Sequence, residues 1–141
     1  MLVDDESKWR NQKFAVSHLH EGSFKAGVGL RAYNIHRDLG VIEATNGLVK
    51  AHVVRAAQPC VKGDTGGRHK HDTLFQFVYM LKGWQTMWIE GHGVITMREG
   101  SSWTQPPGIV HEVLDYSDDR EVVEIIMPAK FDTIDADKPD A

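Results

Sequence analysis

The sequence has little cysteine, no long apolar run and no excess of basic residues. Cys60 is the single cysteine among 141 residues, so no disulfide can form within the chain and a reducing compartment is expected. No apolar stretch reaches the roughly 18 residues that a membrane helix needs, and the charged N-terminus lacks the apolar segment of a signal peptide. These absences favour a soluble, cytoplasmic protein.

The charge of the chain excludes two classes of partner. The formal net charge is −4 and the sequence pI is about 6.0, so there is no basic field to hold nucleic acid or an anionic membrane. A length of 141 residues is enough for one domain with a proper core, which predicts a single domain over residues 1–141. The expected partner is a small-molecule substrate.

Most of the chain is predicted to form short strands. Only residues 4–16 are expected to include a short helix, and the acidic tail after Pro128 is expected to fray at its end. Short runs rich in β-branched and aromatic residues, separated by glycine and proline, predict an all-β sandwich or barrel. The expected strands are 49–57, 75–81, 84–90, 94–99, 101–105, 110–116 and 121–127.

Two His-x-His pairs occur among the eight histidines of the chain. Residues two apart on a strand point to the same face, so His69 and His71 can converge on one metal ion. The pair His18 and His20 has no strand with a further ligand after it, and it is interpreted as solvated or structural. By itself a His-x-His pair is a weak signal, so the surrounding residues decide.

The residues around His69 and His71 follow a two-part pattern. Gly63 lies six residues before His69, Gln76 lies five after His71, and a second block follows after a gap of 16 residues. This spacing resembles the signature of the cupin superfamily, and the resemblance covers residues 63–115 closely. The positions that match are Gly63, His69, His71, Gln76 and Gly83 in the first block, and Gly100, Pro106, Gly108 and His111 in the second.

The resemblance implies a small single-domain cupin with a double-stranded β-helix, or jelly-roll barrel. The segment 1–45 would then extend or cover the barrel. Carried over position by position, the metal ligands would be His69, His71, Gln76 and His111. The implied cofactor is one divalent ion per chain, with Zn, Fe, Mn or Ni as candidates because imidazole suits all of them.

Gln76 departs from the family pattern, which has glutamate at this position. A neutral amide leaves a divalent site with more positive charge than a carboxylate would, and this favours polarisation of a substrate oxygen over redox cycling. The sequence therefore predicts a metal enzyme of isomerase, lyase or cyclase type acting on a small polar metabolite. The alternatives are an iron-dependent dioxygenase and a non-catalytic small-molecule-binding protein.

Strand alternation predicts which side chains face the barrel interior. If Gln76 points inward, so do Val78 and Met80, while the opposite face of residues 75–81 is equally apolar. A strand that is apolar on both faces is covered on both faces. This predicts either a homodimer or a cover formed by the N-terminal segment.

The same reasoning produces a second candidate catalytic residue besides Gln76. The more apolar face of residues 49–57 is expected to be the core face, which places Arg55 inside the barrel. Asp115 shares parity with His111 and is expected there too. Arg55 would then bind either Asp115 or an anionic group of the substrate. The alternative is an arginine at a strand end that reaches solvent.

Overall fold

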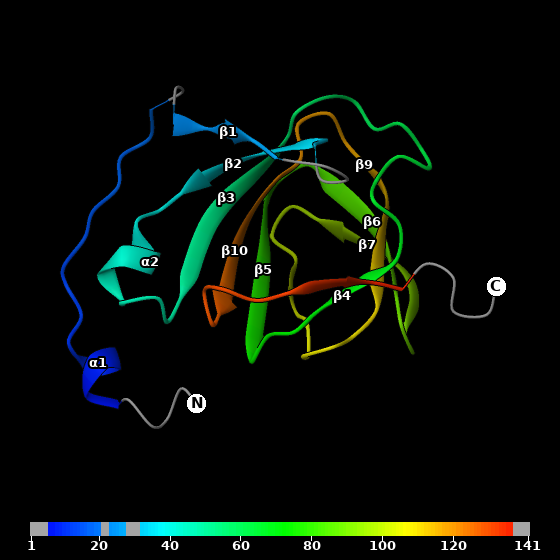
Figure 1. Cartoon of the computed structure of the whole chain (residues 1–141). Helices are drawn as coiled ribbons and strands as arrows, with labels where there is room; N and C mark the ends of the chain where they lie inside the picture. The colour runs from blue at the N-terminus through cyan, green and yellow to red at the C-terminus, as the bar shows by residue number, and fades with distance from the viewer. Residues whose placement is uncertain (1–5, 21–22, 28–31, 137–141) are drawn as a thin grey trace.

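The computed structural model describes residues 6–20, 23–27 and 32–136, and within them the chain is nearly all β (Figure 1). The elements are α1 (Glu6–Arg10), β1 (Lys25–Ala26), β2 (Asn34–Asp38), α2 (Val41–Ala44), β3 (Lys50–Ala56), β4 (His69–His71), β5 (Phe75–Lys82), β6 (Trp84–Ile89), β7 (Gly93–Arg98), β8 (Ser102–Thr104), β9 (His111–Tyr116), β10 (Glu121–Met127) and β11 (Thr133–Asp135). All seven strands expected from the sequence are present, and the short helix α1 lies inside the range predicted for it.

Two antiparallel sheets face each other across the interior. The first has the order β1-β2-β3-β10-β5-β8, and the second has the order β11-β4-β9-β6-β7. Strands distant in sequence are therefore neighbours, as in a jelly roll. The all-β jelly-roll prediction is confirmed. No helix in the described part of the chain is long and apolar enough to cross a membrane.

The turn at Gly83 illustrates why the spacing of glycines carries structural information. Gly83 joins β5 to β6 with φ of +73°, a conformation that side chains rarely adopt. A Cβ atom there would lie 2.1 Å from Ser117 Oγ and 2.6 Å from Asp119 Oδ1. Glycine is therefore required by both the backbone angle and the close approach of the β9–β10 turn.

The core lies between the sheets and is formed by inward residues of both. Val78 and Met80 of β5 are buried, as their parity with Gln76 predicts, and they pack with Met87 of β6 and Val122 of β10. Beside this apolar core the interior also contains buried polar side chains. A cavity lies beside the apolar core and is lined in part by these polar side chains.

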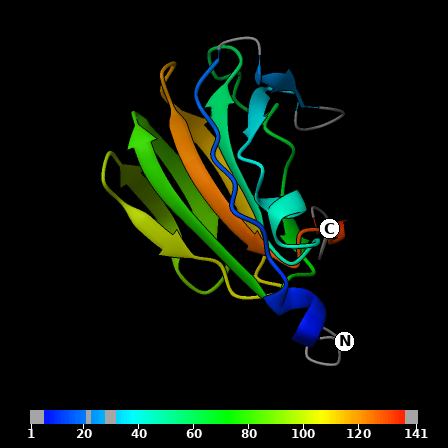
Figure 2. The same ribbon diagram turned by 90° about the vertical axis from the view of Figure 1, so that its left-hand side faces the viewer.

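The outer face of the first sheet is apolar but only partly covered. Phe75, Tyr79 and Leu81 of β5 are exposed, and Phe77 between them is half-buried. In Figure 2 the N-terminal segment 11–20 runs across the front of β3 and β10, and it stays exposed along its length. The homodimer expected from this strand stays a prediction.

Candidate metal centre

Three histidines from two strands converge at one point of the interior. His69 and His71 lie at the two ends of the short strand β4, and His111 begins β9 opposite His69 in the ladder. The ligand nitrogens of the three side chains all lie within 4.8 Å of one another, and the ring centroids are 4.3 to 5.0 Å apart. His69 and His111 are buried and His71 is half-buried. The predicted trio is thus brought together.

Each imidazole is oriented by a contact at its Nδ1 atom. His69 Nδ1 lies 3.0 Å from the carbonyl oxygen of Gly67, and His111 Nδ1 lies 3.0 Å from that of Ile109. His71 Nδ1 lies 2.9 Å from the hydroxyl oxygen of Thr133. Because a carbonyl can only accept, Nδ1 carries the proton in at least His69 and His111, and Nε2 carries the lone pair. This is the arrangement of metal-ligating histidines.

Thr133 belongs to the C-terminal tail, which the sequence was expected to leave frayed at its end. Its strand β11 pairs with β4, placing Thr133 opposite His71. Phe131 also contacts His71, with its ring edge-on to the imidazole at 5.5 Å between centroids. The sequence did not predict β11, because its pairing partner lies more than 60 residues away. The end of the tail, for which fraying is expected, lies outside the described residues.

We expect Thr133→Val to weaken metal binding about tenfold to a hundredfold while leaving the fold intact, because removing an outer partner of a ligating histidine has an effect of this size. Competition with a chromophoric chelator measures the affinity. Thr133→Ser, which keeps the hydroxyl, is the matched control. Equal affinities for the Val and Ser variants would contradict this role of the hydroxyl.

Gln76 lies buried in the same interior on β5. Its Nε2 donates a hydrogen bond to Glu124 Oε2 at 3.3 Å. The amide therefore turns its NH₂ group toward Glu124 and keeps the carbonyl oxygen Oε1 as the atom that can ligate an ion. The three imidazoles form a neutral donor set that fits a divalent ion of the zinc, iron, manganese or nickel kind, and a fourth ligand from the amide oxygen of Gln76 would leave the set neutral.

Glu124 of β10 is the carboxylate that the sequence analysis missed. His52 Nε2 lies 2.7 Å from Glu124 Oε1, so both carboxylate oxygens have a partner. Burial by itself raises the pKa of Glu124, but the hydrogen bond and charge of His52, with smaller contributions from His71 and Lys50, lower it to about 2. Glu124 is the one charged residue in the apolar stretch VVEIIM. A lone charge within an apolar strand could have indicated a functional residue.

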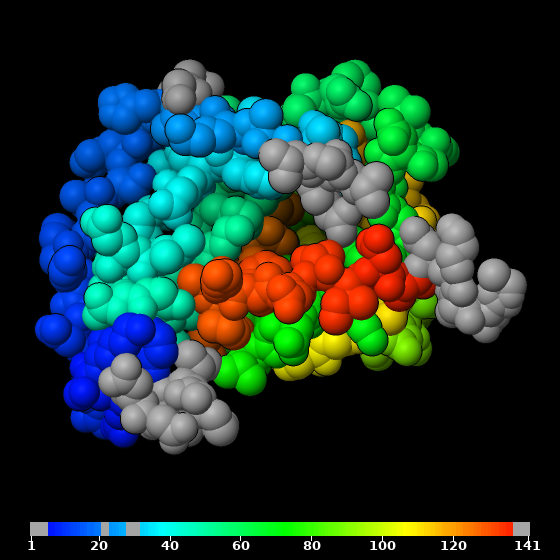
Figure 3. All heavy atoms as spheres, in the orientation of Figure 1, coloured from blue at the N-terminus to red at the C-terminus, as the bar shows by residue number. Residues whose placement is uncertain are grey.

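A cavity of about 220 Å³ connects these groups. Figure 3 shows the surface hollowed beside residues 128–135, where atoms of β10 are visible in the depth. Buried polar and charged side chains line much of the cavity, a composition typical of a site for a polar ligand. The polar and charged lining residues are Asn34, His36, Lys50, His52, His69, His71, Gln76, Gln85, Gln105, His111, Arg120, Glu124 and Thr133.

Gln105 is a further residue beside the histidines that the sequence did not single out. Its Oε1 accepts a hydrogen bond of 3.0 Å from Trp103 Nε1, which turns the Nε2 group toward His111 Nε2 at 3.4 Å. This Nε2 group of Gln105 lies at hydrogen-bond distance from the lone pair of His111 Nε2. When His111 binds an ion, the same N–H group would be free to donate to another acceptor nearby. Gln105 is therefore suited to orient a ligand oxygen.

The expected inward direction of Arg55 is wrong. The cavity is lined by Lys50, His52 and Val54 of β3, so Arg55 lies on the opposite face. There its Nε donates to Glu121 Oε2 at 3.3 Å, and its guanidinium stacks over the ring of Phe24 at 4.1 Å. The prediction assumed that the more apolar face of β3 points inward. It failed because the interior holds a polar cavity, so the polar face of β3 points inward instead.

Asp115 is also not where parity placed it. The pairing of β9 with β6 is irregular between Thr86 and Met87, and the partners of these residues are Asp115 and Val113. This bulge adds a residue to β9 and reverses the alternation after Val113. Tyr116 is buried in consequence, while Asp115 lies 3.7 Å from Lys62 Nζ and does not pair with Arg55.

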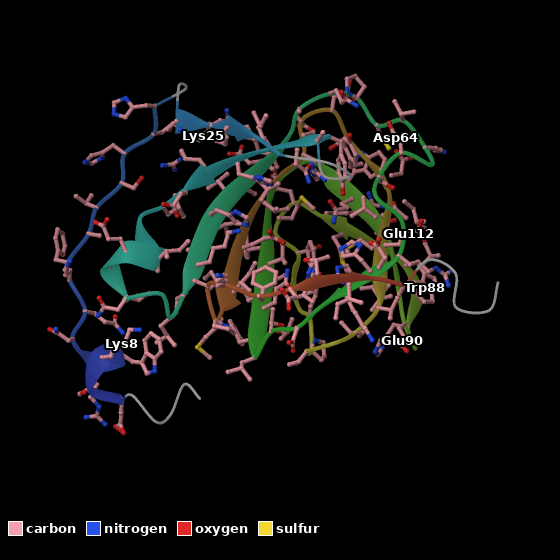
Figure 4. The ribbon with its side chains drawn as sticks, viewed as in Figure 1. Lys8, Lys25, Asp64, Trp88, Glu90 and Glu112 are labelled. Carbon is pink, nitrogen blue, oxygen red and sulfur yellow. The ribbon has the colours of Figure 1, made fainter. Side chains whose placement is uncertain are left out.

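The residues next to the ligands on the second sheet face away from the site. Glu112 pairs with Arg68 at 3.4 Å, and the Arg68 guanidinium lies 3.6 Å from the ring centroid of Trp88. Figure 4 shows Trp88 and Glu112 together on the right-hand side of the molecule.

Cys60 is not an activated nucleophile, because burial and its hydrogen bond with Asp115 raise the pKa of the thiol.

Comparison with known proteins gives one family and several similar folds. A family model described as the cupin domain matches residues 60–127. The structure of KdgF from Halomonas sp. is similar with 17% identity and a TM-score of 0.65, over 84% of this chain and 96% of that chain. The polyketide cyclase RemF from Streptomyces resistomycificus has 13% identity and a TM-score of 0.63, over 86% and 85%.

A sugar phosphate isomerase of the cupin superfamily from Silicibacter pomeroyi has 18% identity and a TM-score of 0.57, over 74% of this chain and 68% of that chain. No curated protein sequence matches the chain significantly. At these identities the structural likeness concerns the fold.

Proposed function

Because a cupin-domain model matches residues 60–127 and the fold is that of small cupin proteins, we propose that this chain is a mononuclear-metal enzyme that isomerises, cyclises or eliminates from a small polar metabolite. The observation that carries the proposal is the pairing, in one cavity, of a neutral donor set with a hydrogen-bonded carboxylate. The fold by itself does not select a reaction, since one fold hosts many chemistries.

The residues that would hold the ion are His69, His71, His111 and Gln76. When bound, a divalent ion supplies Lewis-acid polarisation of a substrate oxygen. Because Gln76 is neutral, the donor set does not offset the charge of the ion, and this favours polarisation over a change of oxidation state. The ion's identity is left to elemental analysis.

Glu124 is the carboxylate placed to act as the general base. Its pKa of about 2 keeps it ionised at neutral pH but makes it a weak base, so proton removal would depend on polarisation of the substrate oxygen by a bound ion. Its Oε2 accepts from the Gln76 amide, so this carboxylate oxygen lies beside the residue expected to reach the ion. A substrate that reached the ion through a carbonyl or hydroxyl oxygen would bring its adjacent C–H or O–H toward Glu124. Removal of that proton is a step that isomerisation, cyclisation and elimination share.

His52 holds Glu124 in position from the opposite side. Its Nε2 contacts Glu124 Oε1, and its ring stacks on His36 with centroids 5.2 Å apart. Burial, and then the neighbouring His52, lower the pKa of His36. Through its contact with Oε1, His52 would orient the Glu124 carboxylate. In a catalytic triad the roles are reversed, because there a carboxylate orients the histidine.

Among the similar structures, one is described as a cyclase and one as an isomerase, which agrees with this reaction type without assigning it. The test is solvent-exchange spectroscopy of the metal-loaded protein in D₂O with sets of small hydroxy acids, oxo acids and sugars. We expect deuterium incorporation or isomerisation under argon as in air. A reaction that consumes oxygen and stops under argon would instead favour the iron-dependent dioxygenase.

A further inference from the structure

Arg120 is a buried cation that the proposed chemistry does not use. Arg120 lies in the β9–β10 turn and is only 2% exposed. It lines the same cavity as the three histidines. Nη1 donates to Gln85 Oε1 at 2.9 Å, and Nη2 donates to Asn34 Oδ1. The guanidinium also lies over the ring of Tyr116, 4.3 Å from its centroid.

These partners do not neutralise the guanidinium. Both hydrogen-bond acceptors are amide oxygens, and within the described chain no carboxylate lies at ion-pair distance from Arg120. Of the five N–H donors of an arginine, Nε is buried without any acceptor in the described structure. A buried charge that lacks a counter-charge is costly, so its presence calls for an explanation.

The charge of the whole cavity points in the same direction. Lys50 and Arg120 are cations, and Glu124 is the one carboxylate among the described lining residues. A divalent ion at the histidines adds two further positive charges, and its donor set contributes no negative one. A filled cavity would therefore carry a large net positive charge, which an anionic ligand would offset.

We infer that the substrate of the metal centre is an anionic metabolite whose carboxylate or phosphate group binds Arg120. This inference rests on the proposed function and names its substrate class. A planar guanidinium fixed by Gln85 and Asn34 is suited to bind an oxyanion through two parallel hydrogen bonds. The cavity volume of about 220 Å³ corresponds to roughly seven water molecules, which fits a small metabolite.

The test uses three probes with the same three-carbon skeleton: glycerate, glycerol 3-phosphate and glycerol. Calorimetry on the metal-loaded chain should give an affinity for at least one anion that exceeds the affinity for glycerol by about tenfold to a hundredfold, because a hydrogen bond to a charged group contributes this much. The anion preferred distinguishes a carboxylate from a phosphate substrate.

Two variants should remove the preference for anions while leaving the metal content unchanged. Arg120→Gln removes the charge, and Gln85→Glu supplies a carboxylate to Arg120 from within the chain. Gln85→Glu should also raise the melting temperature, so it remains informative if Arg120→Gln fails to fold. Arg55→Gln, on the outer face, is the matched control and should bind the anions as the unmodified chain does.

Equal affinities for the three probes would overturn the inference. So would the absence of measurable anion binding at millimolar concentration, or anion binding that survives in both variants. A purely structural Arg120 would give the rise in melting temperature for Gln85→Glu with unchanged anion affinity. Metal content is measured separately, so a chain without metal that still prefers anions through Arg120 would refute only the proposed function.

A second inference rests on the exterior of the molecule. The apolar strip Phe75, Phe77, Tyr79 and Leu81 on the outer face of β5 continues onto β10 through Val123 and Ile125, which are also only partly buried. The N-terminal segment 11–20 is held to the body by a hydrogen bond from Lys13 N to Ala44 O and by one from Arg37 Nη1 to Ser17 Oγ.

That segment carries apolar side chains that its own chain leaves exposed. Phe14 is 92% exposed, Val16 65% and Leu19 54%. We propose that a second copy of the chain covers the outer face, with segment 11–20 of each copy contributing to the contact. Each chain has both the apolar strip and the apolar segment 11–20. In a two-fold dimer the strip and the segment of each chain would therefore both be buried, without any other partner.

Light scattering at micromolar concentration should give a mass of about twice 15.9 kDa. Tyr79→Lys combined with Leu81→Lys should produce a monomer, and Phe14→Ser with Val16→Ser should weaken the dimer at least about tenfold. Val94→Ser, an exposed position on β7 of the other sheet, is the control. A monomeric unmodified chain, or a dimer unaffected by both double variants, would overturn the proposal.

Discussion

Replacing His111 with alanine should reduce the metal content from about one divalent ion per chain to nearly none. His111 supplies one of three imidazoles whose ligand nitrogens lie within 4.8 Å of one another, and its Nδ1 is already held by the carbonyl of Ile109. Loss of a ligand should weaken binding by more than about a hundredfold, since loss of an outer partner alone reaches that range. Elemental analysis of protein purified without chelator measures the effect.

The control for this prediction is His18→Ala. His18 belongs to the other His-x-His pair and lies exposed in the N-terminal segment, away from the cavity-lining residues. Its removal should leave metal content unchanged. Circular dichroism of both variants separates metal loss from unfolding. A folded His111→Ala variant that keeps its full complement of metal would rule out this centre.

Glu124→Gln should lower turnover by about a hundredfold to ten-thousandfold with metal content and fold retained, because removal of a general base typically has an effect of this size. The substitution preserves the shape of the side chain but removes the carboxylate that we propose accepts the substrate proton. The rate of solvent deuterium incorporation into the substrate measures the loss directly.

Glu121→Gln is the matched control, because Glu121 lies on the same strand but pairs with Arg55 and Lys82 on the outer face. Its turnover should match that of the unmodified chain. If both variants lose activity equally, the effect comes from the strand and not from the base. Full activity in Glu124→Gln would assign proton removal to another group.

Much of the architecture could be predicted because it depends on local spacing. His69 and His71 share a strand face by the two-residue period, and Gln76, Val78 and Met80 follow the same rule on β5. Glycine at position 83 suits a tight turn with positive φ between two strands. Each of these features depends on a few consecutive residues, so the sequence contains the information needed.

Other features escaped prediction because they depend on partners distant along the chain. Glu124 meets Gln76 across paired strands 48 residues apart in sequence, and Thr133 reaches His71 across 62 residues. The bulge in β9 that turns Asp115 outward arises from its pairing with β6. No local pattern specifies such a register or partner.

The amino-acid sequence alone predicted seven of the strands and the shared strand face of His69 and His71, because alternation and backbone geometry act over short distances. The place of His111 beside them was implied by the family resemblance. Tertiary structure decided which face of β3 points inward. Both faces of that strand are largely buried, so hydrophobicity could not distinguish them, and the interior is a polar cavity. Lys50 and His52 therefore line the site, and Arg55 lies outside it. The arginine inside the barrel is Arg120, where the sequence predicted Arg55.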